Sequence, residues 1–203
     1  HITLSFLNLN SLHMKTSLFF VCIFFVCSFT LAQTDKEGSE DHPLLSRYPE
    51  SYISYYETVK FREYSLATGS VTGYRHIAEK ESIEGQLTRI TYFVDKSTET
   101  LSIDEVYRDY SLALQKAGIL IIAKGSFPPA NVKKDVGGGQ WIGLALGANK
   151  FQQGAAGNLL FAGTSSSGGT FSIIGKVGRA EGTTFVAIYG ERHNSKKVVV
   201  HVD

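Results

Sequence analysis

The chain has few of the residues that build covalent or metal-bound frameworks. Among 203 residues there are two cysteines, one methionine and one tryptophan. Both cysteines, Cys22 and Cys27, lie in an apolar segment near the start. If that segment is removed on export, the remaining chain has no cysteine, which excludes disulfides, thiol nucleophiles and cysteine-ligated metals. About 171 residues would then remain, enough to bury a core without disulfides.

The chain also lacks an excess of charge of either sign. It has 20 Lys and Arg against 19 Asp and Glu, and loss of Lys15 would leave 19 of each. A nucleic-acid interface needs a basic patch, and docking on anionic lipid needs a basic cluster. The balance therefore argues against both kinds of partner.

Long apolar runs are scarce, and the one present follows the only methionine, Met14. Ten apolar residues run from Leu18 to Cys27, and small residues precede Gln33 at the −3 and −1 positions. This pattern predicts a signal peptide over residues 14–32, with residues 1–13 as upstream sequence or an extended n-region. The alternative is an uncleaved anchor, although the run is shorter than the ~20 residues of a spanning helix. The mature chain is then expected to have no transmembrane span.

Proline is rare, and two of the four prolines fall in a short stretch that follows the predicted cleavage site. Pro43 and Pro49 each fix the backbone and favour an extended residue before them. Leu44 and Leu45 offer an apolar anchor between them, and Arg47 offers a fork-shaped donor. We expect residues 33–51 to form an N-terminal arm that docks on a single domain, residues 52–203.

Three segments carry a resemblance to a known family. They read DKEGSEDHPLLSRYPESYISYYE, QLTRITYFVD and DEVYRDYSLALQKAG. Together they resemble the globular module that precedes the peptidoglycan-binding domain in OmpA-family outer-membrane proteins. The resemblance covers Asp35 to Lys124 well and the glycine-rich remainder loosely. It implies a place in the periplasm or at the outer membrane, and no catalytic residues, because that module has no established chemistry.

The same resemblance bears on the length of the chain. The sequence stops at Asp203, which leaves no room for a peptidoglycan-binding domain. The chain is therefore interpreted either as a stand-alone version of the module or as a fragment of a longer OmpA-family protein.

One helix is predicted, over residues 102–117. Ser102 and Glu105 have the S-x-x-E spacing of a capping box, and Gly118 supplies a left-handed stop. An apolar stripe recurs at helical spacing between them. A buried strand over 119–123 follows directly, so we expect the helix to pack on a sheet.

Alternating patterns predict strands over 52–61 and 86–94, a hairpin of 171–177 with 183–189, and an edge strand over 198–202. Gly175, inside a strand pattern, is typical of a bulge. Residues 77–82 are ambiguous between loop and strand. The fold class is therefore α+β, a mostly antiparallel sheet with one principal helix packed on it.

The clearest candidate for acid–base chemistry is the adjacent pair Asp41 and His42, although neighbours on an extended arm point to opposite sides. A turn-forming aspartate before a proline-restricted histidine is the simpler interpretation. The histidines lack the spacing of a zinc pair. The glycines at 137–139 and the serines at 165–167 are expected to form loops rather than a phosphate cradle or a nucleophile elbow. No cofactor and no metal is predicted.

Tyrosine is the one feature with binding potential, since several tyrosines crowd the start of the domain. Exposed aromatic faces could stack on the sugar rings of a glycan or on a partner protein, whereas half-buried ones would be core. The residues proposed for binding are Asp41, His42, Arg47, Tyr52 and Tyr55.

The sequence as a whole favours a non-catalytic module of the cell envelope that serves as an interaction or spacer domain. Envelope proteins or cell-wall glycan are its expected partners. Two alternatives stay open. One is a small exported hydrolase that uses Asp41 with His42, or His193. The other is a periplasmic binder of a glycan or small ligand.

Overall fold

Two long strands that pair with each other begin the fold. A computed structural model describes residues 33–69, 71–73, 76–95, 100–127, 169–194 and 197–203. Strand β1 spans Ser51–Ala67 and runs antiparallel to β4, Lys80–Asp95. A small pair between them is formed by β2 (Val71–Gly73) and β3 (His76–Ile77). The ambiguous stretch 77–82 is thus the end of β3 and the start of β4.

The main sheet has six strands in the order β1-β4-β8-β7-β6-β5, and every neighbouring pair is antiparallel. The remaining strands are β5 (Leu120–Phe127), β6 (Thr170–Arg179), β7 (Gly182–Asn194) and β8 (Lys197–Val202). The predicted antiparallel sheet and the β6–β7 hairpin are confirmed. All of this lies in one unit of the chain, residues 34–203.

The prediction of an edge strand over 198–202 is wrong. Strand β8 lies inside the sheet, paired with β4 on one side and β7 on the other. Its valines and His201 are buried on both faces. His201 is therefore a buried residue in the middle of the sheet, with β4 on one side and β7 on the other.

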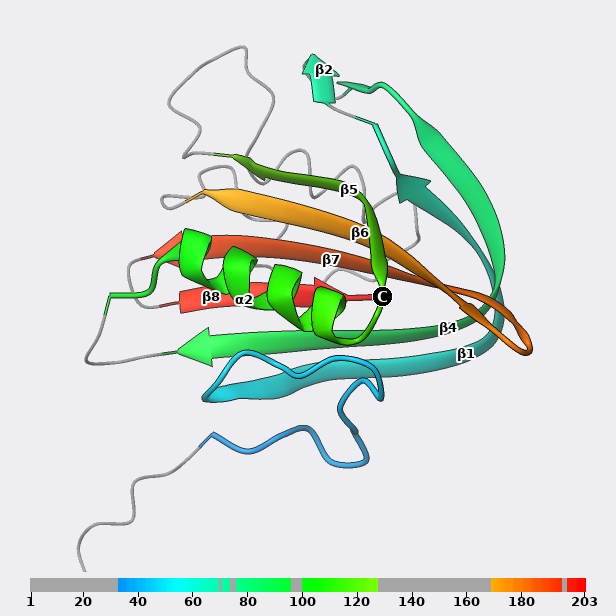
Figure 1. Ribbon diagram of the computed structural model, residues 1–203. Helices are drawn as coiled ribbons and strands as arrows, with labels where there is room; N and C mark the ends of the chain where they lie inside the picture. The colour runs from blue at the N-terminus through cyan, green and yellow to red at the C-terminus, as the bar shows by residue number, and fades with distance from the viewer. Residues whose placement is uncertain (1–32, 70, 74–75, 96–99, 128–168, 195–196) are drawn as a thin grey trace, which may run out of the picture. The chain divides into compact units, whose positions relative to one another are not determined.

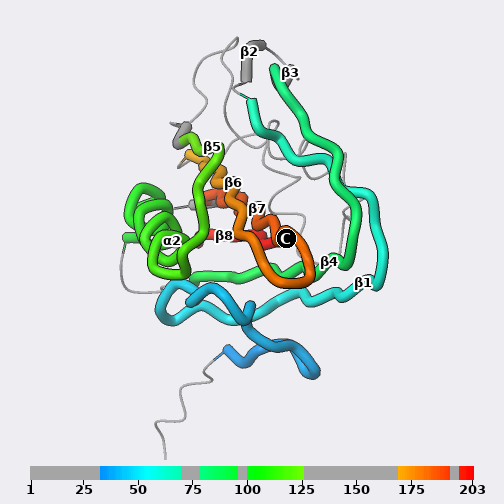
Figure 2. The backbone as a smooth tube through the Cα atoms, turned by 45° about the vertical axis from the view of Figure 1, so that its right-hand side comes forward, coloured from blue at the N-terminus to red at the C-terminus, as the bar shows by residue number. Residues whose placement is uncertain are grey.

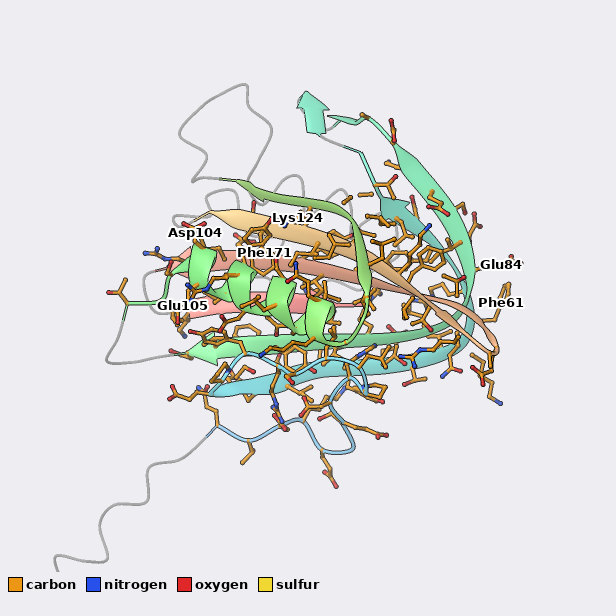
Figure 3. All side chains as sticks on the ribbon, in the orientation of Figure 1. Phe61, Glu84, Asp104, Glu105, Lys124 and Phe171 are labelled. Atoms are coloured by element: carbon orange, nitrogen blue, oxygen red, sulfur yellow. The ribbon has the colours of Figure 1, made fainter. Side chains whose placement is uncertain are left out.

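The predicted helix is confirmed as α2, Ile103–Lys116. The Ser102 hydroxyl accepts a hydrogen bond from the Glu105 amide (3.4 Å), and Gly118 has a φ of 70°. The helix runs across one face of the sheet in Figure 1, where it contacts β5, β6 and β7. Figure 3 places Glu105 at one end of the helix and Phe171 beside it. Rings of Tyr107 and Tyr110 pack on Phe171, with centroids 5.5 and 6.5 Å away.

Beyond the end of β8, strands β1 and β4 continue as a two-stranded ribbon. Only Ile90–Asp95 of β4 pairs with β8, whereas its pairing with β1 extends to Lys80. The ribbon bends away from the plane of the sheet in both Figure 1 and Figure 2.

Buried apolar side chains form two clusters, one on each face of the sheet. One faces the helix, and the other lies on the opposite face and includes Tyr64, Leu66, Leu87, Ile174, Ala187 and Tyr189.

Gly175 marks a close approach rather than a bulge in its own strand. The β6–β7 register is regular through Gly175, while the β5–β6 register shifts between Ile121 and Ala123 in the facing strand. A Cβ on Gly175 would lie 2.6 Å from the Ile119 methyl group. The bulge predicted from Gly175 therefore lies in β5, and the glycine makes room for Ile119.

Several predictions concern residues outside the described part of the chain. They are the signal peptide over 14–32, the loops at 137–139 and 165–167, and the side chains of His76 and His193. Within the described part, no helix combines the length and apolar character needed to cross a membrane.

Candidate functional site

The N-terminal arm is held against the edge of β1 by one arginine–carboxylate fork. Arg47 donates to both carboxylate oxygens of Asp35, at 2.7 and 2.8 Å, and lies 3.1 Å from Asp41. The Asp35 carboxylate also accepts from the Ile53 amide at 2.7 Å. The hydrogen bond from Arg47 is the main cause that holds the pKa of Asp35 below its ordinary value. Arg47, a proposed binding residue, thus lies in an intramolecular clamp.

The side chains of Asp41 and His42 have separate partners. The Tyr92 hydroxyl donates to Asp41 at 3.1 Å, and Nδ1 of His42 accepts from the Leu44 amide at 3.2 Å. Burial lowers the pKa of His42. The His42 ring thus contacts the backbone of its own turn, whereas the Asp41 carboxylate contacts Tyr92 and Arg47. No contact between the Asp41 carboxylate and the His42 ring is described. The arrangement agrees with the simpler sequence interpretation.

The tyrosines near the start of the domain are divided between the two faces of the sheet. Tyr48 is buried on the helix side, where its hydroxyl donates to Glu105 at 3.1 Å. Tyr52 is half-buried and stacks on Phe93, with centroids 5.8 Å apart. Tyr55 is half-buried, donates to Glu57 at 3.0 Å and packs with the opposite cluster. They form no single aromatic platform in the described chain.

A buried polar network on the face opposite the helix was not predicted. Arg89 donates through Nε and Nη2 to the two carboxylate oxygens of Asp203, at 2.7 and 2.9 Å. The Tyr64 hydroxyl donates to the same carboxylate at 2.9 Å. All three side chains are buried, and burial is the main cause that raises the pKa of Tyr64. The alternation of β4 placed Arg89 on this face, but no sequence signal pointed to its partner.

The network continues across the sheet. Thr91 of β4 and Nδ1 of His201 in β8 are 2.7 Å apart, and burial places the pKa of His201 well below its ordinary value. In β7, Glu191 is 1% exposed, and its carboxylate has no hydrogen-bond partner among the described residues. Burial raises the pKa of Glu191 to about 8. A protonated carboxyl group is thus held in the core near neutral pH.

One cleft of about 560 Å³ opens beside this network. Its two walls are the bent part of β4, residues 83–88, and the β6–β7 turn with the start of β7, residues 179–187. Tyr64 and Asp203 contribute to its lining, and so does His42 from the arm. Of the five residues proposed for binding, His42 is the one that the structure places at this cleft.

Among the described residues, no group of three or more His, Cys, Asp or Glu is arranged to hold a metal ion. No protein-family model matches the chain, and a comparison with curated proteins finds no match. The described geometry offers a cleft, a clamped arm and a buried ion pair.

Proposed function

We propose that the chain is a non-catalytic interaction module of the bacterial cell envelope. The observation that carries the proposal is the separation of Asp41 from His42, each engaged by a structural partner. General acid–base catalysis needs a group within hydrogen-bond reach of the proton that it moves, oriented by a second group. The resemblance to the OmpA-associated module supplies the envelope location.

The docked arm supports a role as a preformed surface. Arg47 and Asp35 join the arm to β1, and Tyr48 joins it to the helix through Glu105. Ordering of these residues before binding lowers the entropy lost when a partner docks. An interaction or spacer domain benefits from such a fixed entry into its first strand.

A second candidate function is the binding of a small ligand or glycan. The cleft of about 560 Å³ favours it, because ligand pockets usually measure about 300–1,000 Å³. A glycan site at Tyr52 and Tyr55, which are not among the residues that line the cleft, needs its own test. In that case, recovery on isolated cell-wall sugar should fall in Tyr52→Ala and Tyr55→Ala. Equal recovery of wild type and both variants would remove that idea.

The hydrolase alternative provides the test of the main proposal. Wild type, His42→Ala and His193→Ala are compared on ester, amide and peptidoglycan substrates, with urea unfolding as the measure of folding. We expect release of product at the level of buffer in all three. Turnover by wild type that either substitution abolishes, with an unchanged unfolding midpoint, would overturn the proposal. Cell fractionation and intact-mass measurement test the predicted export. An exported and cleaved chain should be found in the envelope and should begin at Gln33.

A further inference from the structure

A groove of about 500 Å³ lies between helix α2 and the N-terminal arm. The arm wall is formed by residues 44 and 46–49, and the helix wall by residues 109, 110, 112, 113, 116 and 117. The Tyr48 hydroxyl donates to Glu105 at 3.1 Å and so ties the arm to the helix. The groove is separate from the cleft beside Asp203, because the two have no lining residue in common.

Apolar side chains line much of this groove. Leu112 is 44% exposed, which makes it one of three large apolar side chains at the surface of the described chain. Leu44 and Pro49 of the arm line the same groove, together with Ala113 and Ala117 of the helix. A single exposed leucine is ordinary, but a continuous apolar surface with polar residues at its rim is typical of an interaction site.

Two opposite charges on the helix are placed symmetrically about Leu112 and Ala113. Asp109 lies three positions before Leu112, and Lys116 lies three positions after Ala113. With this i, i+3, i+4 and i+7 spacing, the four residues form one stripe of the helix, and all four line the groove. Asp109 is 3.9 Å from the exposed Arg108, and Lys116 is itself exposed. Both charges can therefore pair with a partner.

We propose that a second copy of this chain covers the groove, with the two α2 helices side by side and antiparallel about a twofold axis. In a twofold contact the same surface meets itself. With the axis between Leu112 and Ala113, Asp109 of each copy faces Lys116 of the other. Parallel helices would instead place like charges opposite each other. The inference goes beyond the proposed function and does not depend on it.

The apolar residues fit the same arrangement. Leu112 of each copy faces Ala113 of the other, and a large residue opposite a small one allows the helix axes to approach to about 8–10 Å. Leu44 and Pro49 extend the contact, because the helix of one copy then lies over the arm of the other.

The charges mainly set the direction and register of the two helices. Asp109 and Lys116 are ~10.5 Å apart along the helix axis, so the two ion pairs lie at opposite ends of the contact. Exposed ion pairs add little affinity, but like charges in their place oppose association. One helix flank and a short arm make a small interface, and small interfaces usually bind weakly. We therefore expect a dimer with a Kd on the order of 100 µM.

Sedimentation equilibrium of the purified protein, from about 10 µM to about 1 mM, measures this dimer. Leu112→Ser should weaken association at least about tenfold, because each dimer loses two buried leucines. Phe61→Ser is the matched control, since Phe61 is 65% exposed and Figure 3 shows it on the bent ribbon, away from the helix. This control should associate as wild type does.

Charge reversal tests the antiparallel pairing. Asp109→Lys and Lys116→Asp each place like charges opposite each other at both ends of the contact, so each variant alone should dimerise about tenfold more weakly. An equimolar mixture of the two should associate nearly as well as wild type, because one variant then presents two positive charges and the other two negative ones. Glu84→Lys makes the same change of charge on the bent ribbon, and it should leave the Kd unchanged. Urea midpoints check that every variant is folded.

A protein that stays monomeric at about 1 mM would overturn the inference. A dimer that Leu112→Ser, Asp109→Lys and Lys116→Asp all leave unchanged would do so too, because the contact would then lie on another surface. The antiparallel pairing would be wrong if the mixture of the two charge variants associated no better than either variant alone. None of these results bears on the turnover test with His42 and His193, so failure of the inference and failure of the proposed function are distinguishable.

Discussion

Arg89 of β4 and Asp203, the residue after β8, form a bidentate ion pair in which both side chains are buried, with an Nε–Oδ1 distance of 2.7 Å. The two residues are 114 positions apart in the sequence. Tyr64 of β1 donates to the same carboxylate. The pair thus connects the bent ribbon to the central strand at the base of the cleft.

Removal of the arginine should be strongly destabilising. Arg89→Met leaves the Asp203 carboxylate buried without its counter-ion, and loss of one partner of a buried pair usually costs about 3–5 kcal/mol. We expect a fall of that order in the free energy of unfolding, measured by urea denaturation. Arg62→Met is the control, because Arg62 belongs to a partly exposed pair with Glu57 and its loss should cost at most about 1 kcal/mol. Equal losses would contradict this role of the Arg89 pair.

Gly190 is predicted to be intolerant of any side chain. It lies directly across from Phe171 in the β6–β7 register, and a Cβ there would overlap the Phe171 ring. Phe171 is fully buried and packs against the helix, so it has little freedom to move. Gly190→Ala should lower stability by about 1–3 kcal/mol through overpacking. Gly178→Ala, which has open space around it, should change stability by less than about 1 kcal/mol.

The buried Glu191 should make stability depend on pH. Its pKa is about 8 in the folded protein against an ordinary value of 4.5, so the folded state holds a proton that the unfolded state releases between these two pH values. The contribution of Glu191 to the free energy of unfolding should therefore be most favourable below pH 4.5 and should decrease as pH rises to about 8. The effect should amount to a few kcal/mol, on the order of 1.4 per pKa unit.

Glu191→Gln provides the check, since an amide has no proton to release. Urea midpoints measured between about pH 7 and 8 should become nearly flat in this variant, because the lowered pKa values of His42 and His201 change stability only at lower pH. Glu181→Gln, in the exposed β6–β7 turn, should keep the slope of the wild type. A wild-type slope that survives in Glu191→Gln would show that another group is responsible.

The arm should loosen when its fork is removed. Arg47→Lys keeps the charge but cannot donate to both oxygens of Asp35 in one plane. Because the pair is partly exposed, we expect a modest loss of about 0.5–1 kcal/mol. Hydrogen exchange of the Ile53 amide, which donates to Asp35, should accelerate by about two- to fivefold. Arg108→Lys, in an exposed pair on the helix, should leave that amide unchanged.

The elements that sequence predicted well are those with local signals. The helix begins after Ser102 and ends before Gly118 because the cap and the stop lie within its own residues. The hairpin of β6 and β7 is likewise fixed by a short turn between two alternating runs. Such signals need no knowledge of distant parts of the chain.

The elements that sequence missed depend on partners far away. Strand β8 was predicted to lie at an edge, yet Val202 pairs with Ile90 and with Ile188. Ile90 lies over a hundred positions away in the sequence. The burial of Arg89 depends in the same way on Asp203. The cleft brings together residues of β1, β4, β6 and β7 that lie far apart in the sequence, and such a meeting has no local signature. The fork between Arg47 and Asp35 likewise joins residues whose pairing had no signal in the sequence.

The pKa of the His42 ring, followed by NMR, tests most directly whether the Asp41–His42 pair is structural. A histidine held by a carboxylate as an acid–base pair has a raised pKa, because the charged form is stabilised. Burial without such a pair has the opposite effect, and we therefore predict a pKa below the ordinary value of 6.5 that Asp41→Asn leaves nearly unchanged. A pKa above 6.5 that drops in Asp41→Asn would contradict a purely structural role of the pair. Asp41 and His42 would then again be candidates for acid–base catalysis.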